Sequence, residues 1–306
     1  MSRQESSRKG EDWKKLSRPN VIIRVRPQAE CGGHQETDDR LSVEIRLHSW
    51  TEDTISIEDS HQVREYTFPR KVISPEASQE ESYKSLLPPL MEKFLKPPLS
   101  DDSKVNNAYN ILLFAYGQTG TGKTHSIFGP KTSLSQTENQ SDWGVFPVTV
   151  SKILDHMATV KHEGIECILT VGALDFYVGT CVDLMNNREP VEVDEKRTPL
   201  GYKELQLSSL EELLSFLETI LKARKSFGTR MNEASQEDDH DGSSRSHCAL
   251  ILTLRQVNKE NRQCLVNRFT IVDLAGAERP STTGGERMSA FEAYIEEKNV
   301  LGQLVF

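Results

Sequence analysis

The chain has 306 residues, of which 36% are apolar and 27% charged, and its formal net charge is −9. This length suits one large α/β domain or two smaller ones, whereas the acidic balance argues against general nucleic-acid binding, which needs excess lysine and arginine. No apolar run approaches the length of a membrane span, and the five scattered cysteines include no C-x-x-C pair that would indicate zinc or redox chemistry. We therefore expect a soluble intracellular protein that does not contact membranes.

Residues 1–19 are predicted to form a disordered polar tail, because they contain no apolar stretch. The folded domain is predicted to span residues 20–306. Its first strand covers residues 20–27 and ends at a proline, and short alternating strands follow at residues 41–47 and 54–57.

Ser78 and Glu81 have the spacing of a capping box and predict that a helix begins there. Pro88 and Pro89 should kink or split this helix. An apolar strand at residues 111–116 then leads directly into a glycine-rich loop.

The glycine-rich loop, residues 117–124, reads G-Q-T-G-T-G-K-T and matches the phosphate-loop pattern G-x-x-x-x-G-K-[ST]. Its three glycines let successive backbone N–H groups point inward at phosphates. Lys123 supplies a point charge, Thr124 offers a hydroxyl to Mg²⁺, and a helix that begins near Gly122 directs its positive end at the same anion. The loop predicts a nucleoside triphosphate site.

A surface loop is predicted at residues 131–142, a short helix at 147–157 and a strand at 166–171. The clearest helix follows Ser209 and Glu212, which again have capping-box spacing. Its leucines recur on one face and predict a core-packing stripe rather than a binding surface. They are Leu210, Leu213, Leu214, Leu217 and Leu221.

Two further apolar strands are predicted at residues 248–254 and 265–272. Strands that alternate with helices around a phosphate loop predict an α/β fold of the P-loop NTPase class, with a central, mostly parallel sheet flanked by helices on both faces. Asp273, directly after the last strand, is placed to hold the hydration shell of Mg²⁺, and Gly276 can bring its N–H close to a phosphate.

The segment Ser243–His247 reads S-S-R-S-H and supplies a third part of the predicted site. The hydroxyls of Ser243 and Ser244 can reach Mg²⁺ and the attacking water. Arg245 can pair with Glu278 to close the site over the γ-phosphate. A solvated serine-rich turn is the alternative interpretation of this segment taken alone.

The order of these motifs resembles the kinesin motor domain over most of the chain. The matching segments are residues 24–27 (R-V-R-P), 114–125, 174–177 with 183–185, 231–233, 243–247 and 273–279. A GTPase is not supported, because residues 258–261 begin like the guanine-reading N-K-x-D but lack its aspartate.

The resemblance implies ATP hydrolysis with Mg²⁺, coupled to movement along microtubules in the cytoskeleton of the cytoplasm. The coupled process can also be remodelling of microtubules. The resemblance further implies that Arg24, Arg26 and Pro27 lie against the adenine. The predicted nucleotide contacts are Arg24, Arg26, Pro27, Gly117, Gln118, Thr119, Gly120, Thr121, Gly122, Lys123, Thr124 and His125. The predicted magnesium residues are Thr124, Ser243, Ser244 and Asp273, and the predicted catalytic residues are Ser244, Arg245, Gly276 and Glu278.

Three departures from the family pattern leave alternatives open. Four carboxylates in residues 234–242 separate the N-E and S-S-R-S-H motifs, and we hypothesise that this insert slows closure of the site. Lys196, Arg197 and Lys203 match a tubulin-contacting region, but neighbouring acidic residues dilute them. The C-terminal elements of the family are expected to be incomplete. A nucleotide-binding pseudo-motor, serving as an interaction module, and a truncated product without a stable fold are therefore alternatives. The sequence does not indicate an oligomeric state.

Overall fold

The computed structural model describes residues 20–26, 46–58, 62–68, 71–98, 108–130, 141–177, 179–195, 198–235 and 246–277, with the backbone alone for 226–235. The chain divides into two units, residues 1–77 and residues 78–306. None of the helices in the described ranges is long and apolar enough to cross a lipid bilayer. The predicted boundaries of the tail and of the folded domain stay predictions.

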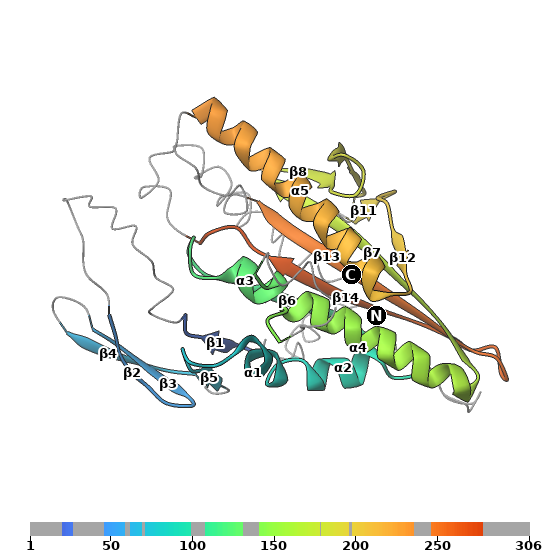
Figure 1. Ribbon diagram of the computed structural model, residues 1–306, viewed down its shortest axis with the longest axis horizontal. Helices are drawn as coiled ribbons and strands as arrows, with labels where there is room; N and C mark the ends of the chain where they lie inside the picture. Colours follow the sequence, from blue (N-terminus) through green and yellow to red (C-terminus); the bar gives the residue numbers. More distant parts are fainter. Residues whose placement is uncertain are drawn as a thin grey trace, which may run out of the picture. The chain divides into compact units, whose positions relative to one another are not determined.

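The first unit contains two small sheets (Figure 1). The strand β1 (Ile22–Arg24) pairs in parallel with β5 (Lys71–Ile73). The strands β2 (Arg46–Trp50), β3 (Thr54–Glu58) and β4 (Val63–Thr67) form an antiparallel sheet. The predicted strands at 20–27 and 54–57 are thereby confirmed, and the described end of the predicted 41–47 strand opens β2.

The second unit is built on a seven-stranded sheet. Its order is β6 (Asn110–Ala115), β14 (Cys264–Asp273), β13 (His247–Asn258), β7 (Ile165–Tyr177), β8 (Thr180–Asp183) and β9 (Glu189–Pro190), and β12 (Leu205–Leu207) also pairs with β7. A separate pair of short strands consists of β10 (Glu192–Val193) and β11 (Pro199–Leu200). The predicted strands at 111–116, 166–171, 248–254 and 265–272 are all present, and three of them are longer than predicted.

The sheet is mixed, so the prediction of a mostly parallel sheet is wrong. Only β6 and β14 run parallel, whereas the other described pairings of this sheet are antiparallel. The reason lies in the connections: a turn at residues 259–263 joins β13 to β14, and such a short link can only reverse the chain. The α/β class and the phosphate loop after β6 agree with the prediction.

The described ranges contain five α-helices, of which the first and the last begin at the two predicted capping signals. They are α1 (Gln79–Lys84), α2 (Pro88–Phe94), α3 (Lys123–Phe128), α4 (Val145–Val160), which ends in a short 3₁₀ turn (Lys161–Glu163), and α5 (Leu210–Ser235). Ser78 and Glu81 form the predicted capping box of α1. The helix ends before the two prolines, and Pro88 opens α2 as its first residue, so the predicted split is confirmed.

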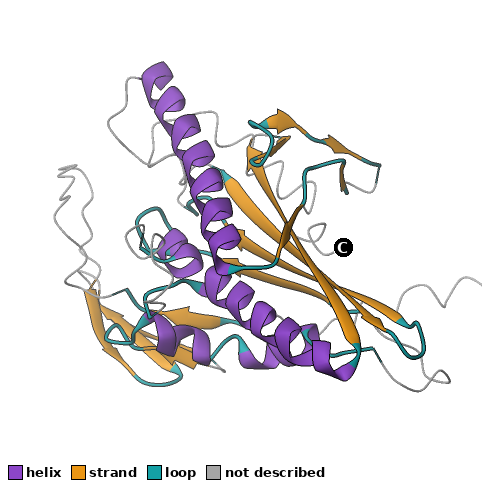
Figure 2. Ribbon diagram, turned by 45° about the vertical axis from the view of Figure 1, so that its right-hand side comes forward, coloured by secondary structure: helices purple, strands orange, loops and turns teal. Residues whose placement is uncertain are grey.

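The main core lies between these helices and one face of the sheet (Figure 2). Alternate strand residues such as Leu113, Ile271 and Leu250 contribute to it, together with buried residues of α2, α3, α4 and α5. The leucine stripe of α5 packs there as predicted, and Phe216 and Ile220 extend it. On the opposite face, the apolar clusters contain no residue of a described helix, and the predicted helices on that face stay a prediction.

Candidate nucleotide site

The phosphate loop connects the end of β6 to the start of α3. Gly122 precedes α3 with φ of +95°, and Gly120 has φ of +79°, both in the left-handed region that favours glycine. The predicted start of the helix near Gly122 is therefore confirmed. Thr121 closes the loop by donating its hydroxyl to the carbonyl of Gln118 at 2.8 Å.

Gly117 lies where the loop meets the segment that follows β14. A Cβ atom at this position would lie 2.6 Å from the hydroxyl oxygen of Thr121, closer than van der Waals contact allows. The carbonyl of Gly117 accepts a hydrogen bond from the N–H of Ala277 at 3.0 Å. The close approach of Thr121 thus favours glycine here, and the carbonyl links the loop to the segment after β14.

Lys123 directs its ammonium group back into the loop. Its Nζ atom donates to the carbonyls of Gly117 at 2.9 Å and Gln118 at 2.8 Å. The positive charge therefore lies at the loop itself, where a polyphosphate would be bound, and the two carbonyls hold the side chain in that place.

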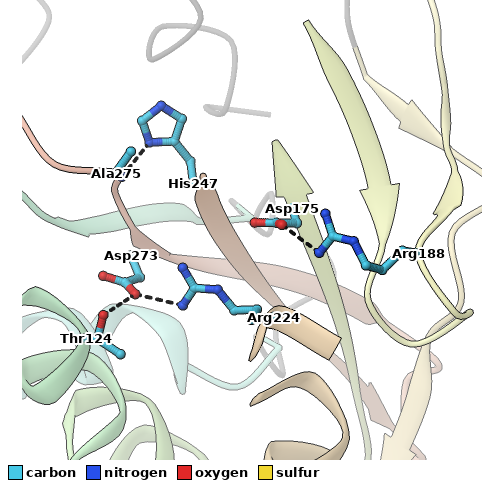
Figure 3. Close-up of polar contacts among 7 residues, drawn as sticks. All are labelled: Thr124, Asp175, Arg188, Arg224, His247, Asp273 and Ala275. Carbon is cyan, nitrogen blue, oxygen red and sulfur yellow. Dashed lines mark hydrogen bonds and ion pairs between the residues drawn. The ribbon is translucent and has the colours of Figure 1, made fainter. Parts of the chain in front are cut away.

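Thr124 and Asp273 connect the loop to the neighbouring strand. The Thr124 hydroxyl donates to Oδ2 of Asp273 at 2.8 Å (Figure 3). The contact arises because β6 and β14 are parallel neighbours, so that their carboxyl ends lie at the same edge of the sheet. The structure thus brings together two of the four residues predicted for magnesium.

Asp273 is fully buried, and a second donor reaches it. Nη1 of Arg224 donates to the same Oδ2 atom at 2.8 Å, and only 4% of the Arg224 side chain is exposed. Burial by itself would lower the pKa of Arg224, but Cys248 and nearby carboxylates outweigh burial and raise this pKa above its usual value. The guanidinium therefore stays charged and fixes the Asp273 carboxylate.

Arg224 was not among the residues predicted for the site. A signal for it exists in the sequence, since Arg224 follows Leu221 by three residues and Leu217 by seven and so continues the leucine stripe of α5. A charged residue on a core-facing stripe requires a buried partner of opposite charge.

His247, the last residue of S-S-R-S-H, contacts the segment after β14. Its Nδ1 atom accepts a hydrogen bond from the N–H of Ala275 at 2.9 Å. Burial lowers the pKa of His247 to about 4, so the ring is neutral at physiological pH and can act as this acceptor. Together with the Ala277 contact to the loop, this bond holds the backbone on either side of Gly276.

His125, predicted to contact the nucleotide, is fixed from the side of α1. Nε2 of Gln79 donates to the His125 carbonyl at 2.6 Å and lies 3.2 Å from its Nδ1 atom. Gln79 is buried and had not been predicted as part of the site. It ties the first residue of α1 to α3.

The remaining predicted site residues belong to the first unit or fall outside the described residues. Arg24 is on β1, and Arg26 follows it, both in the first unit. Pro27, Ser243, Ser244, Arg245 and Glu278 lie outside the described residues. Their predicted roles therefore stay predictions.

The described residues fit a magnesium ion. A threonine hydroxyl and a carboxylate are hard oxygen donors of the kind that Mg²⁺ binds, directly or through water. The second carboxylate oxygen of Asp273, Oδ1, is buried and has no hydrogen-bond partner among the described residues. A buried acceptor of this kind requires a donor or a cation, and water bound to Mg²⁺ would supply one.

A family profile described as the kinesin motor domain matches residues 24–300 of the chain. This match covers most of the sequence. The chain belongs to the kinesin motor domain family.

Known kinesins give the same result. The kinesin heavy chain of Doryteuthis pealeii is 30% identical over 292 residues, which are 93% of this chain and 26% of that protein. The kinesin-like protein Klp61F of Drosophila melanogaster is 29% identical over 242 residues, covering 75% of this chain and 20% of that protein. The chain thus spans about a quarter or less of these curated relatives.

Solved kinesin structures share the fold. One, described as a fast kinesin with implications for its ATPase mechanism and its interactions with microtubules, superposes with a TM-score of 0.67 at 24% identity. The superposition covers 90% of this chain and 71% of that one. At this identity the likeness shows the fold of a kinesin motor domain and not its activity.

Proposed function

We propose that this kinesin motor domain binds and hydrolyses ATP with Mg²⁺ and acts on microtubules in the cytoplasm. The observation that carries the proposal is the contact between Thr124 and Asp273 at 2.8 Å, beside a phosphate loop with Lys123 at its centre. A hydroxyl and a carboxylate that meet at the ends of two parallel strands form the pair of groups that a P-loop NTPase uses around its metal.

In this proposal the backbone amides of residues 117–122 and the Lys123 ammonium bind the β- and γ-phosphates. Thr124 would hold the magnesium ion, and Asp273 would hold its water shell. When bound, the ion neutralises charge that develops on the phosphates. Arg224 keeps Asp273 oriented, so that the carboxylate need not reorganise during the reaction.

The catalytic roles rest on the family resemblance. Ser243 and Ser244 would complete the magnesium site and orient the attacking water, and Arg245 with Glu278 would close over it. Gly276 would detect the γ-phosphate. The support for this last role is that the adjoining Ala275 and Ala277 N–H groups bond to His247 and to the phosphate loop, so that a shift at Gly276 would move both contacts.

The microtubule part of the proposal rests on the family and on three basic residues that match a tubulin-contacting region. Of the three basic residues predicted to face tubulin, only Lys203 is described; it is exposed, and its backbone N–H is bound to Asp183. The adjacent Glu204 reduces the local positive charge. A motor domain that binds nucleotide without responding to microtubules is the alternative that an experiment must separate.

An ATPase assay with and without polymerised microtubules tests the proposal. We expect ATP hydrolysis that rises when microtubules are added. Nucleotide binding without stimulation would support the pseudo-motor, and a folded chain that neither binds nor hydrolyses ATP would contradict the proposal as a whole.

A further inference from the structure

Two buried carboxylates lie on one face of the sheet with a cysteine between them. Asp273 on β14 is paired with Cys248 on β13, and Cys248 is paired with Asp175 on β7. Directly paired residues point to the same face, and neighbouring strands are about 4.8 Å apart, so the two carboxylates are two strands apart. Each side chain is at most 1% exposed.

Two arginines neutralise these carboxylates. Arg224 reaches from α5 into the space between them and donates to Asp273 (Figure 3). Nη1 of Arg188 donates to Oδ2 of Asp175 at 2.8 Å from the opposite side. We call Asp273, Arg224, Asp175 and Arg188 the ionic row. It holds two negative and two positive charges, and removing either arginine would leave a buried carboxylate uncompensated.

The turn that carries Arg188 is held in a strained conformation. Asn187 and Arg188 have φ of +50° and +61°, which side chains other than glycine adopt at a cost. The turn is fixed by the buried Asp183, whose carboxylate accepts the N–H of Met185 and whose carbonyl accepts the N–H of Arg188. The turn therefore holds the Arg188 backbone in a fixed place, from which its guanidinium reaches Asp175.

Asp175 has an acceptor available for a second guanidinium. Its Oδ1 atom is buried and has no hydrogen-bond partner among the described residues. The negative charge of Asp175 also acts on Arg224 and is one of the causes that raise the pKa of its guanidinium. The two carboxylates therefore compete for Arg224. Because Arg188 partly neutralises Asp175, it weakens the attraction between Asp175 and Arg224.

We propose that Arg188 is a positioning residue of the nucleotide site, which keeps Arg224 on Asp273 by pairing with Asp175. The inference rests on the proposed function, because its consequence lies at the magnesium pair. Without Arg188, Arg224 moves toward Oδ1 of Asp175. Asp273 then loses the hydrogen bond from Arg224 and keeps only the one from Thr124 among the described donors. The contribution of Mg²⁺ to nucleotide binding then falls.

Calorimetric titration of the folded chain with ADP, in Mg²⁺ and in EDTA, tests this inference. The measured quantity is the ratio of the two dissociation constants, which reports magnesium coupling without requiring hydrolysis. We expect Arg188→Gln to lower this ratio about tenfold, as outer-shell changes at metal sites do. The double variant Asp175→Asn with Arg188→Gln removes the competition and should return the ratio to within about threefold of the wild type, a difference of about 0.7 kcal/mol.

Arg262→Gln is the matched control. Arg262 has the same φ of +61° but lies in the turn at the opposite end of β13 and β14, so its substitution should leave the ratio unchanged. The inference is overturned if Arg188→Gln keeps the wild-type ratio, or if the double variant stays as low as the single one.

If Arg188→Gln does not fold, Asp175→Asn alone supplies the test. In this variant Asp273 is the one carboxylate left in the ionic row, so no second carboxylate of the row attracts Arg224. The ratio of the two dissociation constants should stay near the wild-type value. A tenfold fall would overturn the inference. A wild-type chain that binds ADP equally with and without Mg²⁺ contradicts the proposed function itself. That result differs from one in which the wild type binds more tightly with Mg²⁺ and the variants keep its ratio, so the two failures can be distinguished.

Discussion

The phosphate loop and the ionic row meet at Asp273, but they are built in different ways. The loop consists of eight consecutive residues, closes through bonds between near neighbours such as Thr121 and Gln118, and remains partly exposed. The row combines residues of two strands, one turn and one helix, and its side chains are largely buried. A ligand site needs accessible groups, whereas the frame that orients them can be hidden and assembled from distant segments.

This difference predicts different consequences for the two regions. Substitutions in the loop should weaken nucleotide binding and hydrolysis with little loss of stability. Substitutions in the row should destabilise the fold first, because they leave buried charges without a partner.

The largest effect is expected for Arg224→Met. Removing the guanidinium leaves Asp273 and Asp175 with one arginine between them, and breaking a buried pair costs about 3–5 kcal/mol of unfolding free energy. Urea unfolding measures this loss. Arg255→Met, on an exposed position of β13, is the control and should change the free energy by less than about 0.5 kcal/mol. Equal losses in both variants would remove the distinction between row and surface.

His247 should make stability depend on pH. Its pKa is about 4 in the folded chain and about 6.5 when unfolded, so the unfolded state gains a proton first as pH falls. The contribution of His247 to the free energy of unfolding is fully present above pH about 6.5. It is lost as the pH falls towards about 4, by up to about 3 kcal/mol. His247→Asn keeps an acceptor for the Ala275 N–H but does not titrate. Its unfolding free energy should fall less steeply over this range, and an unchanged slope would contradict the assignment.

Lys123→Ala should abolish function without unfolding the chain. Loss of the phosphate-binding charge should lower ATP hydrolysis at least about 100-fold, equivalent to about 2.7 kcal/mol. Steady-state hydrolysis and thermal unfolding measure the two effects. Lys222→Ala, on an exposed turn of α5, should leave hydrolysis unchanged. A loss of less than about threefold for Lys123→Ala, below 1 kcal/mol, would argue that the loop is not the phosphate site.

The smallest effect is expected for Gly117→Ala. The added methyl group would lie 2.6 Å from the Thr121 hydroxyl and force the loop to shift. We expect nucleotide affinity to fall about tenfold, equivalent to about 1.4 kcal/mol. Gly179→Ala is matched to it as a glycine of positive φ with nothing within 4 Å of the new atom. Nucleotide titration should separate the two variants, and equal affinities would show that the packing at Gly117 is not required.

Much of this architecture could be predicted from short stretches of sequence. The capping box at Ser78, the Ser209 cap of α5 and the loop at 117–124 each lie within at most eight consecutive residues, and local chemistry determines them. Strand direction could not be predicted in the same way. Apolar runs such as 248–254 do not encode their pairing, and the short link at 259–263 is defined only by the observed ends of β13 and β14.

The ionic row shows where sequence reasoning stopped. Arg224 could have been found by following the leucine stripe one turn beyond Leu221. The pairing of Asp175 with Arg188 could not, because it depends on the register between β7 and β8 and on a turn with positive φ at Arg188. Burial of a charge is visible only after the strands are aligned.

The most direct test of the account is calorimetric titration of the wild type and Thr124→Val with ATP, in Mg²⁺ and in EDTA. We expect the wild type to bind ATP at least about tenfold more tightly with Mg²⁺, a difference of about 1.4 kcal/mol. Thr124→Val, which removes the hydroxyl that contacts Asp273, should lose this difference while remaining folded. A folded wild-type chain whose ATP affinity is the same in Mg²⁺ and in EDTA would contradict the central claim.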